Sequence, residues 1–266
     1  SADAPTLITL GGNITVPAGG DYDTPPINGS GHFKIDGGGH TITWESTANN
    51  HHLLGNTSPD ADAVYIELTN INLDRQDMNA AVGVYNGKIT LGKDVALSGQ
   101  DGNMILANGE KAALELGDGC ELSYAAGSSP CCASAWFGAI LVLNGGKTAA
   151  GAYIGLDCNF YPAVSYPLIS VPKALTGDVH LLLKMIGTTP VAQGIGNYQL
   201  TQADCDRLKV NPESTVSLYM GQRDKYDGNF ELHLDPAASF QIKLRPKNFT
   251  PPTSGNIDVT NMTDVV

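Results

Sequence analysis

Short apolar stretches recur along the chain, and several of them run directly into an Asn-Gly pair. Residues 82–85, 104–107 and 140–143 precede Asn86-Gly87, Asn108-Gly109 and Asn144-Gly145. Asn and Gly both tolerate the left-handed backbone conformation that a tight corner needs. The pattern therefore predicts short strands that are separated by tight corners.

Alternating apolar and polar residues follow each corner and form a second series of expected strands. These strands are marked by Ile42, Ile71, Val95, Cys120 and Cys158, which follow one another at similar steps until a longer last one. A period of about 24 residues with two or three short strands per repeat is typical of a solenoid, in which each repeat stacks on its neighbours. Leucine-rich repeats have a similar period, but their leucine spacing does not occur in this sequence.

We therefore expect an all-β fold, a single-stranded right-handed parallel β-helix over about residues 7–197, with rungs about 4.8 Å apart. The alternative is a β-sandwich with Asn-Gly hairpins, which the in-register repetition of whole rungs disfavours. Inward-facing side chains should form three stacks. These are Ile42, Ile71, Val95, Cys120 and Cys158, then Leu73, Leu97, Leu122 and Phe160, and finally Val84, Leu106 and Val142.

The chain divides into three expected segments. Residues 1–197 form the β-helix, 198–247 form a C-terminal cap, and 248–266 form an extended tail. Thr201 and Asp204 fit a capping box that opens one short helix through Leu208. Strands at 217–219, 230–234 and 240–244 should complete the cap, because a solenoid must cover its last apolar rung.

An apparent insertion interrupts the repeat. The stretch from Cys120 to Asn144 is almost twice as long as the matching stretch from Val95 to Asn108. The extra residues fall in the segment 125–138, which carries a vicinal cysteine pair and Trp136. Because long loops of a solenoid project from one side, we expect this segment to be a surface loop.

Composition and charge exclude several classes of protein. The net charge is −12, and only four arginines are present, so nucleic acid and anionic membrane surfaces are poor partners. No apolar run approaches the roughly 20 residues that span a bilayer, so we expect no membrane insertion. Only seven of the 27 acidic residues are Glu, and Gly and Pro are abundant, which disfavours an all-helical fold.

Two segments of the sequence resemble a known family. They are residues 33–42, with the sequence FKIDGGGHTI, and residues 198–204, with the pattern Tyr-x-Leu-Thr-x-Ala-Asp. The chain from about 30 to 245 is similar to pectate-lyase-like β-helix proteins, in particular to adhesin-like surface proteins of gut Bacteroidetes. The resemblance implies a secreted or cell-surface protein without an established enzymatic role. No signal peptide is visible, and the first residues look like a trimmed terminus.

An enzyme of this fold would need a set of acidic residues. The strings Asn-Thr-Asp, Asp-Asp, Gly-His-Gly and Arg-Ile-Lys, which related hydrolases carry, do not occur in this sequence. The alternative catalytic set is Asp74, Arg75, Asp77 and Asp101, in which Asp77 and Asp101 would stack at adjacent corners. Solvated corner aspartates explain the same residues, so we expect no catalytic site.

Metal and cofactor sites are not expected. The Asp-x-Asp pairs at 21/23, 60/62 and 204/206 lack the spacing of a calcium loop, and His51-His52 would point to opposite faces of a strand. No zinc-type spacing surrounds the cysteines. They are expected to be buried thiols or disulfides, with Cys120 and Cys158 in contact. The redox state of Cys131, Cys132 and Cys205 is left open.

Aromatic side chains provide the binding hypothesis. Trp136, Phe137, Tyr161 and Tyr166 cluster in sequence, and rings of this kind stack on the C–H faces of sugars. The alternative is a tryptophan that packs against the flank of the solenoid. We expect a non-catalytic β-helix that binds an extracellular glycan or another surface protein. The alternative function is a polysaccharide lyase or glycoside hydrolase, and the oligomeric state is left open.

Overall fold

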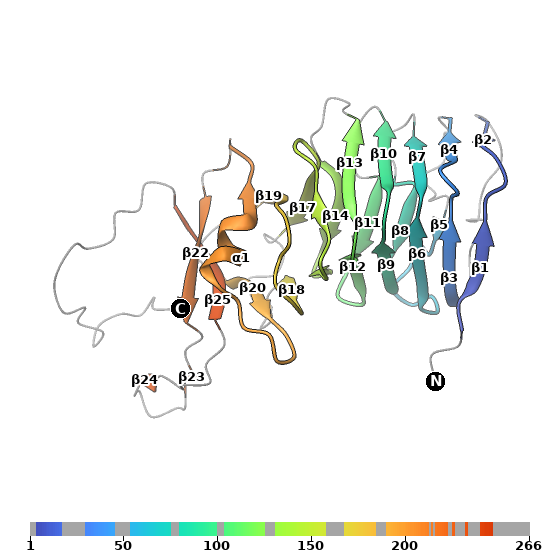
Figure 1. Ribbon diagram of the computed structural model, residues 1–266. Helices are drawn as coiled ribbons and strands as arrows, with labels where there is room; N and C mark the ends of the chain where they lie inside the picture. The colour runs from blue at the N-terminus through green and yellow to red at the C-terminus, as the bar shows by residue number, and fades with distance from the viewer. Residues whose placement is uncertain are drawn as a thin grey trace.

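The structure is a computed structural model (Figure 1). It describes residues 4–17, 30–45, 54–75, 80–99, 104–125, 131–157, 168–184, 190–212, 214, 216–222, 225–226, 232–233 and 240–246. Within some strands, a few side chains are not described. All structural statements below refer to this part of the chain.

The fold is a parallel β-solenoid built from three sheets, here called A, B and C. From residue 31 to residue 157, each turn of the chain contributes a strand to sheet A, then to sheet B, then to sheet C. Sheet A contains, in spatial order, β1 (Thr6–Thr9), β3 (Gly31–Asp36), β6 (Val64–Thr69), β9 (Gly87–Leu91), β12 (Ala112–Leu116), β15 (Ile140–Leu143), β18 (Ile169–Val171), β20 (Pro190–Gly194), β25 (Phe240–Pro246) and β22 (Val216–Gln222).

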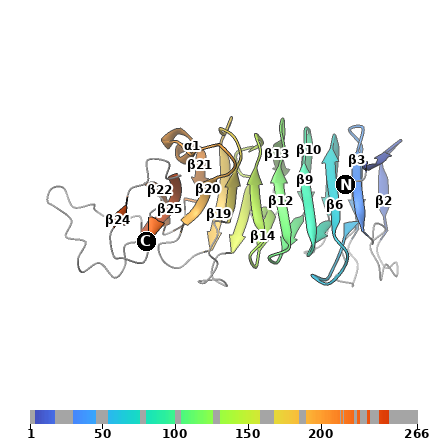
Figure 2. The same cartoon turned by 90° about the horizontal axis from the view of Figure 1, so that it is seen from below.

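Sheets B and C complete the walls of the solenoid. Sheet B contains β2 (Ile14–Val16), β4 (Thr41–Trp44), β7 (Ile71–Arg75), β10 (Val95–Gly99), β13 (Glu121–Ala125) and β16 (Lys147–Thr148). Sheet C contains β5 (Leu54–Gly55), β8 (Val82–Val84), β11 (Ile105–Asn108), β14 (Cys131–Trp136), β17 (Tyr153–Asp157), β19 (Val179–Lys184) and β21 (Leu208–Val210). The strands stack side by side along the solenoid axis (Figure 2). The predicted parallel solenoid is therefore confirmed.

The core is the interior of the solenoid, and it is filled by alternate residues of every strand. In sheet A the aligned inward residues are Ile66, Ile89, Leu114, Leu141 and Ile169, each at most 1 % exposed. Alternation of side chains across a strand places the intervening residues on the outer surface. The inner face is thus fixed by packing, and the outer face is where the three sheets differ.

In successive turns, the corner between sheets A and B contains a residue in the left-handed backbone conformation. Asn70 has φ 48°, Asp94 has φ 55°, Gly119 has φ 74° and Gly145 has φ 88°. At the corner between sheets C and A, Gly87 has φ 127°, and a Cβ there would lie 1.9 Å from the carbonyl oxygen of Val64. Only glycine fits that position, because the neighbouring turn approaches too closely.

The described residues of the first two predicted stacks are buried in the interior, but only some of their partners are as predicted. Cys158 and Phe160, which are also predicted in these stacks, lie outside the described residues. Ile71 aligns with Val95 and Leu73 with Leu97, as predicted. Ile42, however, pairs with Leu73, and Leu97 pairs with Tyr124. The corners differ in length by two residues, so a fixed period shifts the partner while the side chain keeps its face.

The third predicted stack is wrong. Val84 faces inward and is buried, but it pairs with Ala107, so Leu106 points outward. Val142 lies in sheet A opposite Glu115, and it also points outward.

The predicted surface loop is also wrong for residues 131–136, whereas residues 126–130 lie outside the described residues. Residues 131–136 form β14 in the middle of sheet C, where Trp136 pairs with Asn108 of the preceding turn. Asn144-Gly145 lies at the corner after sheet A, whereas Asn86-Gly87 and Asn108-Gly109 lie at the corner after sheet C. Two corners of different kinds carry the same dipeptide, and aligning them created the apparent insertion.

The C-terminal end of the solenoid is covered by an antiparallel extension of sheet A. β25 pairs antiparallel with β20 and with β22. Helix α1 (Gln202–Arg207) begins at a capping box in which Thr201 and Asp204 exchange hydrogen bonds, as predicted. The Asp204 carboxylate also accepts hydrogen bonds from the Leu175 amide and the Tyr198 hydroxyl, at 2.9 and 2.6 Å. This carboxylate therefore ties the helix to the last turns.

Two small pieces complete the described elements. β23 (Lys225–Tyr226) and β24 (Leu232–His233) pair with each other antiparallel. In the described part of the chain, no helix is long and apolar enough to cross a membrane.

Candidate functional site

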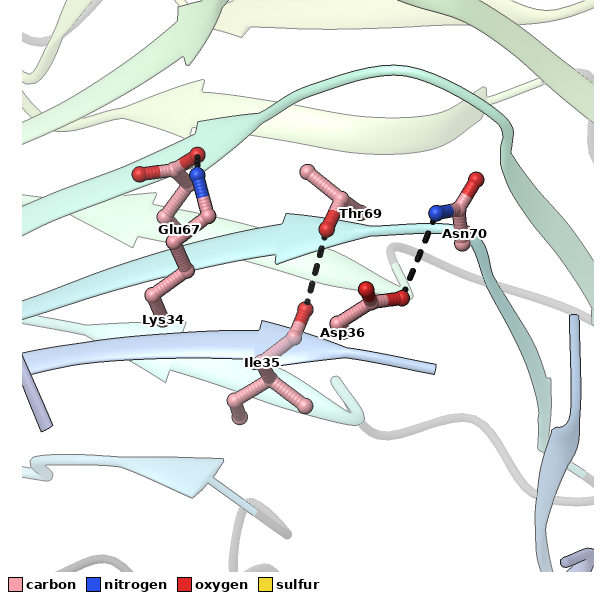
Figure 3. A network of polar contacts seen from close by, with 6 residues as sticks. All are labelled: Lys34, Ile35, Asp36, Glu67, Thr69 and Asn70. Carbon is pink, nitrogen blue, oxygen red and sulfur yellow. Dashed lines mark hydrogen bonds and ion pairs between the residues drawn. The ribbon is translucent and has the colours of Figure 1, made fainter. Parts of the chain in front are cut away.

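The outer face of sheet A carries ion pairs between neighbouring turns. Lys34 Nζ lies 2.5 Å from Glu67 Oε1, and Lys88 Nζ lies 2.6 Å from Glu115 Oε2. Beside the first pair, the Asp36 carboxylate accepts a hydrogen bond from the Gly38 amide. It accepts a second one from Asn70 Nδ2, which Figure 3 shows. These two bonds lower the pKa of Asp36. These charged side chains are thus engaged with partners in the same or the neighbouring turn.

Glu115 is the most buried acid of sheet A. Its side chain is 11 % exposed, and Asn144 Nδ2 donates to Oε1 at 2.9 Å. Burial raises the pKa of this carboxyl, but the hydrogen bonds from Lys88 and Asn144 and the charge of Lys88 outweigh burial and lower it. The carboxylate therefore stabilises the fold at neutral pH.

The outer face of sheet B is different, because it is hollowed. An open groove of about 480 Å³ crosses the four strands β4, β7, β10 and β13, which belong to four successive turns. Its described lining residues are Thr41, Asn72, Asp74, Ala96, Leu97, Ser98, Ser123, Tyr124 and Ala125. The outward residues Ala96, Ser98, Ser123 and Ala125 are small, and their size leaves the space.

Hydroxyl, amide and carboxylate groups line this groove. Ser98 Oγ donates to Asp74 Oδ1 at 2.9 Å, and Asn72 Nδ2 lies 3.5 Å from Thr41 Oγ1. Asp74 is the charged side chain among the described lining residues. Tyr124 borders one end of the groove, but it pairs with the inward residue Leu97 and its half-buried side chain packs against the core. The small residues Ala96 and Ala125 therefore supply the apolar surface. The groove therefore combines hydrogen-bonding groups with some apolar surface.

The alternative catalytic set is split between the two faces of β7. Asp74 points into the groove, whereas Arg75 is 0 % exposed and points into the core. The Arg75 guanidinium carbon lies 4.8 Å from the centroid of the Trp44 ring, and Nη1 donates to the Ala80 carbonyl oxygen. Adjacent residues of a strand point to opposite faces, so Asp74 and Arg75 do not act together. Asp77 and Asp101 lie outside the described residues.

Trp136 and Phe137 lie at the corner that follows β14. Their ring centroids are 6.3 Å apart with an interplanar angle of 89°, and both side chains are half-buried. A Cβ on Gly155 of the next turn would lie 3.5 Å from Trp136 Nε1, so the indole packs on the outer face of sheet C. Tyr161 and Tyr166 lie outside the described residues.

The four described cysteines are buried thiols. Burial raises the pKa of Cys120 to about 12, and it raises the pKa of Cys132 as well. Thiols with raised pKa values are poor nucleophiles. Glu121 pairs with Lys147, so the position level with Cys120 in the next turn is Gly146. Cys158 lies outside the described residues.

The remaining candidates are dispersed. The described residues hold no group of three or more His, Cys, Asp or Glu side chains that could bind a metal ion. Asp204 serves the capping box, and Asp206 accepts from Gln202 Nε2 at 2.7 Å. The Asp60/Asp62 pair belongs to the loop before β6. His51-His52 and the Asp21/Asp23 pair lie outside the described residues.

Comparison with known proteins gives no relatives. No family model matches the chain, and neither a curated protein nor a solved structure matches it significantly. The solenoid fold therefore rests on the structure itself.

The sequence did contain a signal for the groove. In β10 and β13 the outward positions are Ala96, Ser98, Ser123 and Ala125, so small residues occupy one face in consecutive turns. A run of small outward residues predicts a hollow, but only once the partners across the turns are known. The fixed period aligned these two strands incorrectly, and the signal was hidden.

Proposed function

We propose that the protein binds an extended glycan in the groove of sheet B and does not cleave it. The observation that supports this proposal is the groove itself, an open hollow of about 480 Å³ lined by hydroxyl, amide and carboxylate groups. Sugars present hydroxyl groups, and Ser98, Asn72 and Asp74 offer hydrogen-bonding partners for them. A groove that follows several turns suits a chain of several sugar units.

The charge of the groove restricts its ligand. Asp74 is an acceptor for hydroxyl groups when ionised, and it repels carboxylate and sulfate groups. The chain as a whole carries a net charge of −12. We therefore propose a neutral or amino-bearing glycan rather than a uronate.

The binding role is favoured over hydrolysis or elimination. A retaining or inverting glycosidase needs two carboxyl groups on opposite sides of the scissile bond. Among the described lining residues, Asp74 provides one carboxyl, and Arg75 lies on the other side of the strand. Secretion or display at the cell surface, which the resemblance to adhesin-like proteins implies, would expose the groove to such glycans and belongs to the proposal.

A glycan array with titration of the hits tests the proposal, and product release is measured in the same samples. We expect neutral or amino oligosaccharides to bind and uronate oligomers not to bind, with no new reducing ends or unsaturated products. Asp74→Asn keeps the shape of the groove but removes its charge, so it should weaken binding by several-fold. Binding that is confined to uronates, or measurable cleavage, would contradict the proposal.

The Trp136 surface is the second place where a glycan could bind. Its indole packs over Gly155, so truncation should lower stability rather than affinity. Titration of Trp136→Ala against the parent chain separates the two surfaces. Affinity lost in Trp136→Ala and retained in Asp74→Asn would move the binding site from sheet B to this corner.

A further inference from the structure

The two ends of sheet B differ in how they are covered. At the C-terminal end, the Thr148 amide donates to the Asp178 carbonyl oxygen at 2.9 Å, so the chain itself occupies the position beyond β16. At the N-terminal end, β2 pairs with β4 on one side only, and no described strand lies on its other side. Figures 1 and 2 show β2 at the extreme end of the solenoid.

The first turn is also the place where apolar residues are exposed. Ile14 faces inward, in line with Ile42, yet it is 42 % exposed, whereas Ile42 is 7 % exposed. Leu7 of β1 is 71 % exposed. An unpaired parallel strand with exposed apolar side chains is a site where another strand can add.

The tail of the chain contains a second copy of the β2 sequence. Residues 12–16 read Gly-Asn-Ile-Thr-Val, and residues 255–259 read Gly-Asn-Ile-Asp-Val. In the first copy, Asn13 Oδ1 accepts a hydrogen bond from the Thr41 amide at 3.0 Å, and Ile14 stacks on Ile42. The same residue types at residues 255–259 carry what a strand needs to stack on β2.

The tail is too short to reach β2 of its own chain. Sheet A separates β1 from β25 by eight steps, which is about 38 Å at about 4.8 Å per step. Nine residues lead from Pro246 to Gly255, and they span at most about 32 Å when fully extended. The path must also cross from sheet A to sheet B, so a tail strand can reach only a neighbouring molecule.

We propose that residues 255–259 of one molecule add as a parallel strand to β2 of a second copy. Ile257 and Val259 would cover Ile14 and Val16, and Asn256 would accept a hydrogen bond from the Asn13 amide. Each molecule has one such tail and one such edge at opposite ends, so the contact is head-to-tail and continues into linear chains. This assembly is independent of glycan binding.

Two complementary variants of the full chain test the proposal. The tail variant Ile257→Asp/Val259→Asp keeps β2, and the edge variant Ile14→Asp keeps the tail. Sedimentation velocity over a wide concentration range, at physiological salt to screen the charge of −12, measures assembly. The parent chain should form concentration-dependent oligomers, each variant alone should be monomeric, and their mixture should stop at dimers. The control Met262→Asp lies in the tail beyond the repeated sequence and should assemble like the parent chain.

Hydrogen exchange gives a second measurement that does not depend on the variants. The amides of Asn13 and Thr15 point away from β4, because the backbone of Val16 faces it. These two amides should exchange at least about tenfold more slowly in the oligomer than in the tail variant. A parent chain that is monomeric at all concentrations would overturn the proposal. Equal protection of β2 in the parent and the tail variant would also overturn it, because another segment, such as residues 18–29, would then cover the edge.

Discussion

The outer faces of sheets A and B belong to the same turns of one solenoid, yet they carry different chemistry. On sheet A, Lys88 and Glu115 pair across turns, and a third partner, Asn144, completes the contact. On sheet B, the corresponding turns carry Ala96, Ser98 and Ser123 around a hollow. In these turns the backbone ladders of both sheets are parallel. The charged side chains on the outer face of sheet A thus stabilise the fold by pairing across turns. The small residues on the outer face of sheet B leave a groove that can hold a ligand.

The largest effect is expected from a pair of neighbours within β7. Arg75→Ala should lower the free energy of unfolding by about 3 kcal/mol, because it removes the contact with the Trp44 ring and leaves the Ala80 carbonyl oxygen without this donor. Asp74→Asn, one residue earlier on the outer face, should change stability by less than about 1 kcal/mol. Chemical denaturation measures both. Equal losses would mean that the outer face of sheet B is also needed for the fold.

A smaller loss is expected on sheet A. Glu115→Ala should cost about 1–3 kcal/mol, since it removes the nearly buried acceptor of the half-buried Asn144 amide and of the more exposed Lys88 ammonium group. The matched variant Glu67→Ala removes a similar but more exposed ion pair and should cost at most about 1 kcal/mol. Thermal unfolding of the two variants compares them. If Glu67→Ala were the more damaging change, the burial of Glu115 would not explain its role.

The smallest effect is a pH dependence. The folded state lowers the pKa of Glu115 below 4.5, so its contribution is complete above this value and is lost as the pH falls through the folded-state pKa. The free energy of unfolding of the parent chain should therefore fall more between pH 6 and pH 3 than that of Glu115→Gln. Urea titrations at both pH values measure the difference. An identical fall in the two proteins would show that this carboxyl has the same pKa in both states.

Much of the solenoid could be predicted because the alternation of apolar and polar residues shows which side chains face the interior. Ile71, Val95 and Leu97 had to alternate with polar neighbours, and their burial follows from that alternation. The pairing register between strands was harder to predict, because the corners vary in length. A register shift of two residues leaves every side chain on the same face, so the alternation does not reveal it. The strand at 131–136 was missed because its alanine, serine and cysteine residues lack the β-branched pattern of an ordinary strand.

The groove escaped prediction for a related reason. Sequence patterns draw attention to charged and aromatic residues such as Asp74 and Trp136. A groove, in contrast, forms where neighbouring side chains are small. Ala96 and Ser123 become informative only when they are known to lie side by side. For the alternative catalytic set, the structure separates only Asp74 from Arg75, because these two residues are adjacent in one strand and face opposite ways.

Two tryptophan substitutions test the central claim most directly. Ala96 on sheet B and Ala113 on sheet A are both outward-facing, half-buried alanines in adjacent turns. Calorimetric titration with an oligosaccharide identified on the array measures each variant against the parent chain. Ala96→Trp fills the groove and should weaken binding by at least about tenfold, which corresponds to about 1.4 kcal/mol, while Ala113→Trp should bind like the parent. Unchanged affinity in Ala96→Trp, or an equal loss in both variants, would contradict the assignment of the glycan site to sheet B.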